Sequence, residues 1–193
     1  EKFTFLVTGK IDSHMFYRIE ASLKGLAAAR ANGLDARLIV AGWMSSPAAA
    51  KCRDLAATLD LGGAVSMTGP YTQEDAPAVY RSADAYLMLK HNDPCPNAVL
   101  EALACGLPVL YSDSGGVPEL VGGDCGVALA CAESWQRPHW PAPAAVAEGM
   151  RAIADNREAM AASARCRAVA RFDIAPWIER HRAVFADLLG ARP

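Results

Sequence analysis

The sequence predicts an α/β domain with a doubly wound parallel sheet of the Rossmann-like kind. Short apolar runs alternate along the chain with alanine-rich segments at helical spacing. Each apolar run is continuous instead of alternating with polar residues, which is typical of parallel strands buried on both faces. Strands and helices in regular alternation indicate a sheet that helices cover on both sides.

Glycine and proline mark the first two strand–helix steps. The run FTFLVTG (3–9) is an expected strand, and the alanine-rich helix 20–33 stops at an Asn-Gly pair. The second strand, ARLIVAG (36–42), is followed by a helix at 47–62 that has proline in its first turn and ends on glycine. These signals place the connections on the surface between buried elements.

The alternation continues through the middle of the chain. AVSMTG (64–69) is the third expected strand, and the next helix, 72–83, opens with Thr72 and Asp75 at capping-box spacing. DAYLMLK (84–90) is the fourth strand. The later elements are a helix at 97–105 that Gly106 ends, strands at 108–112 and 126–130, and helices at 144–155, 157–171 and 174–189.

The last helices carry an amphipathic pattern with three large aromatic side chains. We expect Phe172, Trp177 and Phe185 to pack on a core, although a partner domain could use the same face. The segment between strand and helices, ESWQRPHWPAP (133–143), is rich in tryptophan and proline and is expected to be a loop.

Composition favours one globular domain in a reducing compartment. The chain has 193 residues, 52% of them hydrophobic, and a formal net charge of −2, which argues against a nucleic-acid partner. The six cysteines have neither zinc-site spacing nor the density of a disulfide scaffold, so we expect reduced thiols and a cytoplasmic location. No apolar run approaches the ~20 residues of a membrane span. The start, without an initiator Met, suggests a fragment of a longer protein.

In a doubly wound sheet, ligands bind beyond the carboxyl ends of the strands. The most informative loop lies at 90–97, because it leads into a helix whose free N–H groups can hold a phosphate or diphosphate around Asn97, Ala98 and Val99. Asp93 and Glu101 flank this point and can accept hydrogen bonds from sugar or ribose hydroxyls. The alternative, from turn chemistry, is that Asp93 forms an Asp-Pro turn and Glu101 is an exposed helix charge.

The first loop supplies cations but no glycine-rich fingerprint. Lys10 and Arg18 can neutralise a diphosphate, or can be ordinary solvated charges. A single glycine after the first strand, instead of G-x-G-x-x-G or a P-loop, counts against a dinucleotide oxidoreductase. The glycine pair of SDSGG allows a close backbone approach to a ligand or a plain tight turn. His14 and His91 are the histidines nearest this edge, and no catalytic triad or metal-ligand spacing is present.

A resemblance to a known family follows from these segments. The stretch DPCPNAVLEALACGLPVLYSDSGGVPELV (93–121), with LIVAG, VSMTGPYTQEDAPAVYRSADAYLML and RFDIAPWIERH around it, resembles the C-terminal, donor-binding domain of retaining glycosyltransferases of the GT-B fold, in particular family four. The likeness is strongest at 93–121. It implies a hexosyltransferase-type enzyme that uses a UDP- or GDP-sugar and requires no cofactor or metal.

The resemblance also implies roles for residues. Glu101 matches the glutamate that accepts hydrogen bonds from the nucleotide ribose, and Asp93 matches an acidic residue near the transferred sugar, with aspartate in place of glutamate. Gly9 and Lys10 match half of the family's cationic loop, and Arg18 stands in for its missing lysine. The family's backbone contacts to sugar and diphosphate correspond to Pro96, Asn97 and Ala98, and its base contacts to Gly69, Pro70 and Tyr71.

The likeness further implies that residues 1–193 are one nucleotide-sugar-binding domain and that an N-terminal acceptor domain is absent from this chain. That missing domain would bind a sugar, lipid or small-molecule acceptor and would provide any peripheral membrane contact, so the isolated domain is expected to be inactive. Two alternatives remain open: a non-catalytic nucleotide-sugar-binding module, and an epimerase or phosphorylase of similar architecture.

Overall fold

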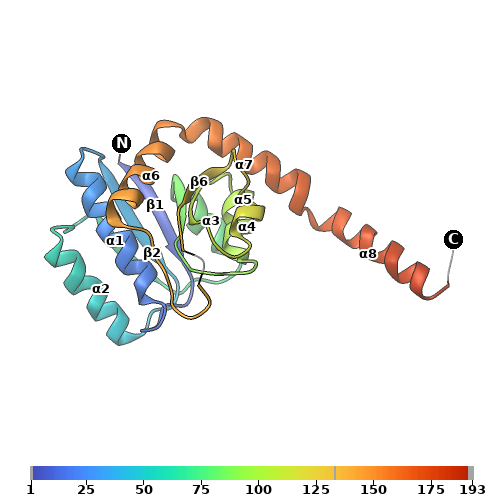
Figure 1. Cartoon of the computed structure of the whole chain (residues 1–193), viewed down its shortest axis with the longest axis horizontal. Coiled ribbons are helices and arrows are strands. Elements are labelled where there is room, and N and C mark those ends of the chain that lie inside the picture. The colour runs from blue at the N-terminus through green and yellow to red at the C-terminus, as the bar shows by residue number, and fades with distance from the viewer. Residues whose placement is uncertain (1, 133, 191–193) are drawn as a thin grey trace.

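The computed structural model describes residues 2–132 and 134–190 and confirms the predicted architecture (Figure 1). Six parallel strands form one sheet in the order β3-β2-β1-β4-β5-β6. The strands are β1 (Phe3–Thr8), β2 (Ala36–Ala41), β3 (Val65–Gly69), β4 (Ala85–Met88), β5 (Val109–Ser112) and β6 (Gly126–Leu129). The helices are α1 (Phe16–Ala31), α2 (Ser46–Thr58), α3 (Ala76–Arg81), α4 (Asn97–Ala104), α5 (Val117–Val121), α6 (Pro143–Asp155), α7 (Arg157–Phe172) and α8 (Ile174–Leu188).

β1 lies at the centre and divides the core into two clusters. Its side chains alternate between the faces of the sheet. Phe5 and Val7 join the cluster formed with α1, α2 and α6, whereas Leu6 joins the cluster formed with α3, α4, α5 and α7. The strand is paired with β2 along its whole length and with β4 at Phe5 and Leu6. The central strands β1, β4 and β5 are therefore buried on both faces, as predicted, whereas the edge strand β3 is largely exposed.

Three predicted helix bounds differ from the structure, each for a local reason. α1 begins at Phe16 instead of residue 20, because Asp12 Oδ1 accepts the backbone N–H groups of His14 and Met15, both at 3.0 Å, and so organises the first turn. α2 ends at Thr58, before the predicted residue 62, where Asp60 adopts a left-handed φ of 54°.

The third difference concerns α3, which is shorter than the predicted 72–83. The Asp75 N–H donates to Thr72 Oγ1 at 3.2 Å, as the capping-box spacing predicts. The Thr72 hydroxyl in turn donates to Asp75 Oδ2 at 2.7 Å, so these two side chains hold residues 73–75 in a turn, and the α-helix begins at Ala76.

The prediction that the terminal aromatic residues pack on a core is wrong for two of the three. Phe172 packs against the second cluster, but Trp177 is 48% exposed and Phe185 is 58% exposed. α8 contains no buried residue and projects away from the sheet (Figure 1). Trp177 stacks instead on His181, with ring centroids 3.7 Å apart. Residues 134–142 of the loop predicted at 133–143 form irregular chain, and Glu133 lies outside the described residues.

Candidate functional site

The strand order reverses between β1 and β4, and a cavity of about 410 Å³ opens beyond the carboxyl ends of these two strands. Several predicted residues line it, from the loop after β1 and from the loop that leads into α4: Gly9, Lys10, Arg18, Asp93, Pro96, Asn97 and Ala98. The sequence analysis missed six others, which are Thr8, Asp12, Met15, Tyr86, Met88 and Lys90. These residues could have been found by examining the ends of the strands at this switch point and the segments that follow them.

Arg18 is the most deeply buried cation of the cavity. It lies in the first turn of α1, just after the loop that follows β1, and is 6% exposed. One guanidinium nitrogen donates to the Lys10 carbonyl at 3.3 Å, and within the described residues its Nε has no partner. The Nε atom is itself sealed from solvent, so its missing hydrogen bond is a cost to the fold, whereas the guanidinium as a whole borders the cavity and brings a positive charge to it. Gly9 has a left-handed φ of 124°, and a Cβ at this position would lie 3.1 Å from a terminal guanidinium nitrogen of Arg18.

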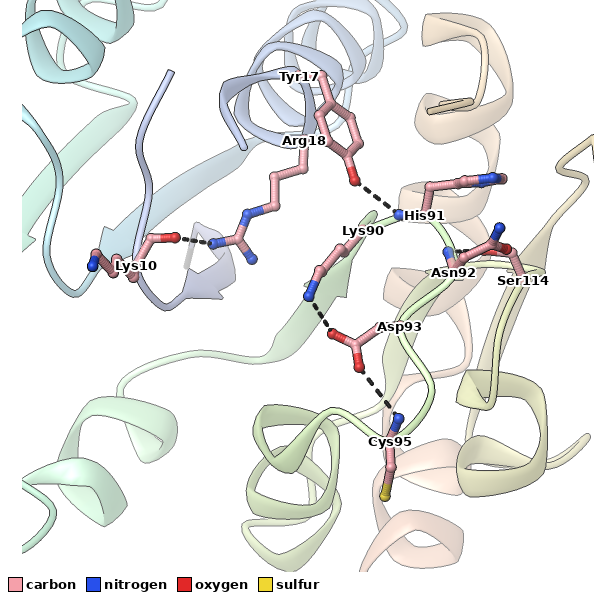
Figure 2. Close-up of polar contacts among 9 residues, drawn as sticks. All are labelled: Lys10, Tyr17, Arg18, Lys90, His91, Asn92, Asp93, Cys95 and Ser114. Carbon is pink, nitrogen blue, oxygen red and sulfur yellow. Dashed lines mark hydrogen bonds and ion pairs between the residues drawn. The ribbon is translucent and has the colours of Figure 1, made fainter. Parts of the chain in front are cut away.

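Lys10 lies in the loop after β1, and its side chain points away from Arg18 (Figure 2). Its ammonium lies 5.2 Å from the centre of the exposed Trp43 ring. An exposed cation–π contact of this kind is weak, about 0.5–1 kcal/mol, so it does not prevent the flexible side chain from turning toward a diphosphate.

Lys90 and Asp93 form an ion pair at the mouth of the cavity. Lys90 Nζ lies 2.8 Å from Asp93 Oδ2, and Figure 2 shows Lys90 pointing from the end of β4 toward this carboxylate. Asp93 Oδ1 accepts the Cys95 N–H at 3.2 Å. The side chain of Asp93 is 13% exposed. The carboxylate thus shapes the Asp-Pro turn while it borders the cavity.

The N-terminus of α4 faces the cavity with two free backbone donors. Within the described residues, the Asn97 and Ala98 N–H groups have no partner. The prediction for Val99 needs correction, because its N–H donates to the Pro96 carbonyl at 3.0 Å and its side chain is fully buried. Two N–H groups and the positive end of the helix dipole thus remain for an anion.

The glycine pair of the sequence serves the protein backbone. A Cβ at Gly115 would collide with the Asp93 carbonyl, and one at Gly116 would collide with the Pro94 carbonyl. The Gly116 N–H donates to the Asp93 carbonyl at 2.9 Å. The pair therefore lets the turn after β5 press against the loop that carries Asp93.

Glu101 lies outside the cavity wall but on the adjacent face of α4. It is exposed, and its position one turn after Asn97 and Ala98 places it on the same side of the helix. Its Oε2 accepts a hydrogen bond from the buried Tyr80 hydroxyl at 2.7 Å. A carboxylate held in this way is more ordered than a free surface charge.

The three predicted base contacts lie at the end of β3, beyond the cavity wall. Gly69 and Pro70 are accessible there, and Tyr71 is partly buried against the second core cluster. The Gly69 carbonyl accepts the Gly42 N–H at 2.8 Å, which ties the ends of β3 and β2 together.

His91 is directed away from the cavity. Its ring lies 3.2 Å from Cys131 Sγ through Nδ1 and 2.8 Å from the Ser134 carbonyl through Nε2, and its backbone N–H donates to Tyr17 Oη at 3.0 Å (Figure 2). Burial raises the pKa of the Cys131 thiol, so it is a poor nucleophile at neutral pH. His14 is exposed and lies outside the cavity lining. Neither histidine is placed to act on a ligand in the cavity.

Other features of the described chain bear on function. Among residues 2–132 and 134–190, no three His, Cys, Asp or Glu side chains are arranged to hold a metal ion. Within the same ranges, no helix has the length and apolar character that a membrane crossing needs. A hollow of about 540 Å³ lies between α7 and the residues that precede β6, away from the carboxyl ends of the strands, and it does not include the predicted residues.

Comparison with solved structures identifies the class of fold. Sucrose-phosphate synthase from Thermosynechococcus elongatus superposes with a TM-score of 0.75 at 21% identity, over 100% of this chain and 47% of that one. The C-terminal domain of the group 1 glycosyl transferase LpcC from Francisella tularensis gives a TM-score of 0.72 at 15% identity, over 89% of this chain and 87% of that one. The fold is the Rossmann-like fold of GT-B glycosyltransferases.

The sequence comparisons define the family. The model for glycosyl transferases group 1 matches residues 1–138, and the chain belongs to that family. A GDP-mannose-dependent alpha-(1-6)-phosphatidylinositol dimannoside mannosyltransferase of Mycobacterium tuberculosis is 32% identical over 173 residues, which are 89% of this chain and 40% of that protein. A D-inositol 3-phosphate glycosyltransferase of Salinispora arenicola is 39% identical over 64 residues, 33% of this chain and 14% of that protein. The chain thus spans less than half of either relative.

Proposed function

We propose that this chain is the donor-binding, C-terminal domain of a retaining glycosyltransferase that uses a nucleoside diphosphate sugar. The observation that carries the proposal is the switch-point cavity, which the buried Arg18 guanidinium and the N-terminus of α4, with its free Asn97 and Ala98 N–H groups, line together. This combination suits a diphosphate, because a guanidinium and a helix N-terminus both bind anionic oxygens and a diphosphate presents several of them.

The neighbouring groups extend the proposed site in two directions. Glu101 lies on one side, where it would accept hydrogen bonds from ribose hydroxyls, and Asp93 lies at the mouth, where it would contact the sugar. The edge at Gly69, Pro70 and Tyr71 would hold the base. Relatives and neighbours carry names that mention GDP-mannose, UDP and UDP-glucose, which supports a UDP- or GDP-sugar as donor.

In the proposed reaction the bond between the anomeric carbon and the diphosphate oxygen breaks, an acceptor hydroxyl oxygen bonds to the same face of the sugar, and the hydroxyl proton passes to the departing diphosphate. The charge that develops on the departing diphosphate would be stabilised by Arg18, Lys90, Lys10 and the first turn of α4. These cations supply the charge that a metal would otherwise provide, so the proposed mechanism needs no metal or other cofactor. The acceptor, whether sugar, lipid or small molecule, would bind to a second domain outside this chain.

Calorimetric titration of the chain with UDP, GDP and ADP tests the donor site. We expect one of them to bind, and Glu101→Ala, Lys10→Ala and Lys90→Ala each to weaken it by about tenfold, which is ~1.4 kcal/mol. Lys24→Ala, a lysine of α1 paired with Glu20 and outside the cavity, is the matched control and should bind normally. Equal affinity in all variants would refute the site.

A longer protein that contains this chain distinguishes the enzymatic alternatives. Transfer to an acceptor, with the anomeric configuration of the donor kept, supports the proposal. Tight nucleotide-sugar binding without transfer would identify a binding module. A changed sugar in the absence of any acceptor would identify an epimerase, and release of a sugar phosphate when phosphate is the acceptor would identify a phosphorylase.

A further inference from the structure

Three buried hydroxyl groups connect the floor of the cavity to Glu101. Tyr86 Oη lies 3.0 Å from Thr8 Oγ1, and Thr8 Oγ1 lies 3.2 Å from Tyr80 Oη. Tyr80 Oη in turn lies 2.7 Å from Glu101 Oε2. The three hydroxyl residues are at most 2% exposed, whereas Glu101 is exposed on α4. The chain of bonds therefore reaches from inside the sheet to a surface carboxylate.

The directions of these hydrogen bonds follow from counting donors. An ionised carboxylate only accepts, so the Tyr80 hydroxyl must donate its one hydrogen to Glu101. Thr8 must then donate to Tyr80, and Tyr86 must donate to Thr8. Burial is the main cause that raises the pKa of both tyrosines, so both hydroxyls keep their hydrogen at neutral pH. Each of the three hydroxyls, Tyr86, Thr8 and Tyr80, thus has an acceptor for its hydrogen.

The arrangement fixes one oxygen of Glu101 and leaves the other open. Within the described part of the chain, Glu101 Oε1 has no hydrogen-bond partner. A glutamate on an exposed helix face ordinarily samples several rotamers, and ordering it on binding weakens affinity. The short bond from Tyr80 removes that freedom before a ligand arrives.

We propose that Tyr80 is a positioning residue that holds Glu101 for the hydroxyl groups of a nucleotide ribose. The inference rests on the proposed donor site and deepens it, because it assigns the selection of ribonucleotides over deoxyribonucleotides to the Tyr80–Glu101 pair. A fixed acceptor discriminates strongly against a ligand that lacks the matching hydroxyl, because the acceptor then stays unpaired. Thr8 and Tyr86, which line the cavity, support Tyr80 from beneath.

The test compares ribose and deoxyribose ligands. The chain is titrated by calorimetry with UDP, GDP and ADP. The titration is then repeated with the 2′-deoxy and 3′-deoxy forms of the nucleotide that binds best. In the native chain we expect at least one deoxy form to bind about tenfold more weakly. In Tyr80→Phe we expect affinity for the ribonucleotide to fall by about five- to tenfold, and affinity for that deoxy form to change by less than about twofold.

Two comparisons separate positioning from a structural effect. Tyr111→Phe removes the hydroxyl of another buried tyrosine, one that makes no hydrogen bond within the described residues, and should leave discrimination unchanged. In a Glu101→Ala background, Tyr80→Phe should have no further effect on ribonucleotide affinity, because Tyr80 acts through the missing carboxylate.

The outcomes distinguish the two proposals. A native chain that binds no nucleotide, or that binds ribose and deoxyribose forms equally, overturns the assigned role of Glu101 and the inference with it. If the native chain prefers the ribonucleotide and Tyr80→Phe keeps the same preference, only the positioning role of Tyr80 is overturned. Two results would show that Tyr80 has a structural role alone. In one, Tyr80→Phe weakens the ribose and deoxyribose ligands to the same extent. In the other, Tyr80→Phe weakens ribonucleotide binding as much in the Glu101→Ala background as in the native chain.

Discussion

A side chain at position 116 would collide with the carbonyl group of Pro94, which lies across the interface between the turn after β5 and the loop after β4. The backbone of Gly116 has a φ of −92°, a value that any residue adopts, so the requirement for glycine is one of space alone. The contact joins the loop that carries Asp93 to the rest of the sheet edge. The shape of the candidate site thus depends on a residue that does not line it.

Gly116→Ala should destabilise the protein and displace the Asp93 loop. We expect a loss of about 1–3 kcal/mol in the free energy of unfolding, because a backbone carbonyl cannot move aside as a flexible side chain does. Thermal or urea unfolding measures the loss, and nucleotide affinity should fall in parallel. Gly123→Ala is the matched control, because a Cβ there meets nothing within 4 Å, and it should change stability by less than about 0.5 kcal/mol. Equal stability of the two variants would contradict the contact.

The start of α1 should make stability depend on pH in the acid range. The backbone N–H of Met15 is the main group that holds the pKa of Asp12 below its ordinary value of 3.8, and the His14 N–H adds to the effect. Because the folded pKa is lowered, the stabilisation is fully present well above 3.8 and is lost as the pH falls through the folded-state value.

Asp12→Asn is therefore expected to have a lower unfolding midpoint than the native chain at pH 7, with a difference that shrinks as the pH falls below 3.8. Thermal unfolding followed by circular dichroism between pH 7 and pH 3 measures this difference. Asp54→Asn, which changes an exposed carboxylate of α2, is the control and should follow the native chain. A difference that stays constant over the whole range would contradict the role of the Asp12 charge.

Removal of α8 should leave the stability of the domain unchanged. No residue of this helix is buried, and its apolar side chains, including Trp177, Phe185 and Leu188, are exposed. A chain that ends at Phe172 should keep its unfolding midpoint within about 2 °C, because the cut removes no core contact. Truncation before α7 is the comparison, since it removes Ala164 and Ala168 from the second core cluster and should lower the midpoint. A large loss on removal of α8 alone would show that its apolar face packs on the domain.

The elements of the fold could be predicted from the sequence because their signals are local. Continuous apolar runs marked the six strands, and Asn-Gly, the first-turn proline and Gly106 marked helix ends close to their observed places. The errors lie where a side chain acts on a neighbouring turn, as Asp12 does ahead of α1. The resemblance at 93–121 likewise indicated the correct family, because that motif is contained in one continuous segment.

The membership of the cavity needed the tertiary structure. Lys90, Thr8 and Tyr86 lie in apolar strands or at their ends, and nothing in their local sequence distinguishes them from core or surface residues. The aromatic residues of α8 show another limit of prediction from sequence, since amphipathic spacing indicates an apolar face but not what covers it.

The sequence by itself thus determined the order of strands and helices, the parallel class of the sheet and the family, because periodicity, capping and a continuous motif are properties of neighbouring residues. Only the tertiary structure decided that the ends of β1 and β4 meet, that Arg18 is buried beside them, and that Tyr80 reaches Glu101. These relationships join residues far apart in the chain, and they exist only once the sheet order brings buried polar groups within hydrogen-bond distance.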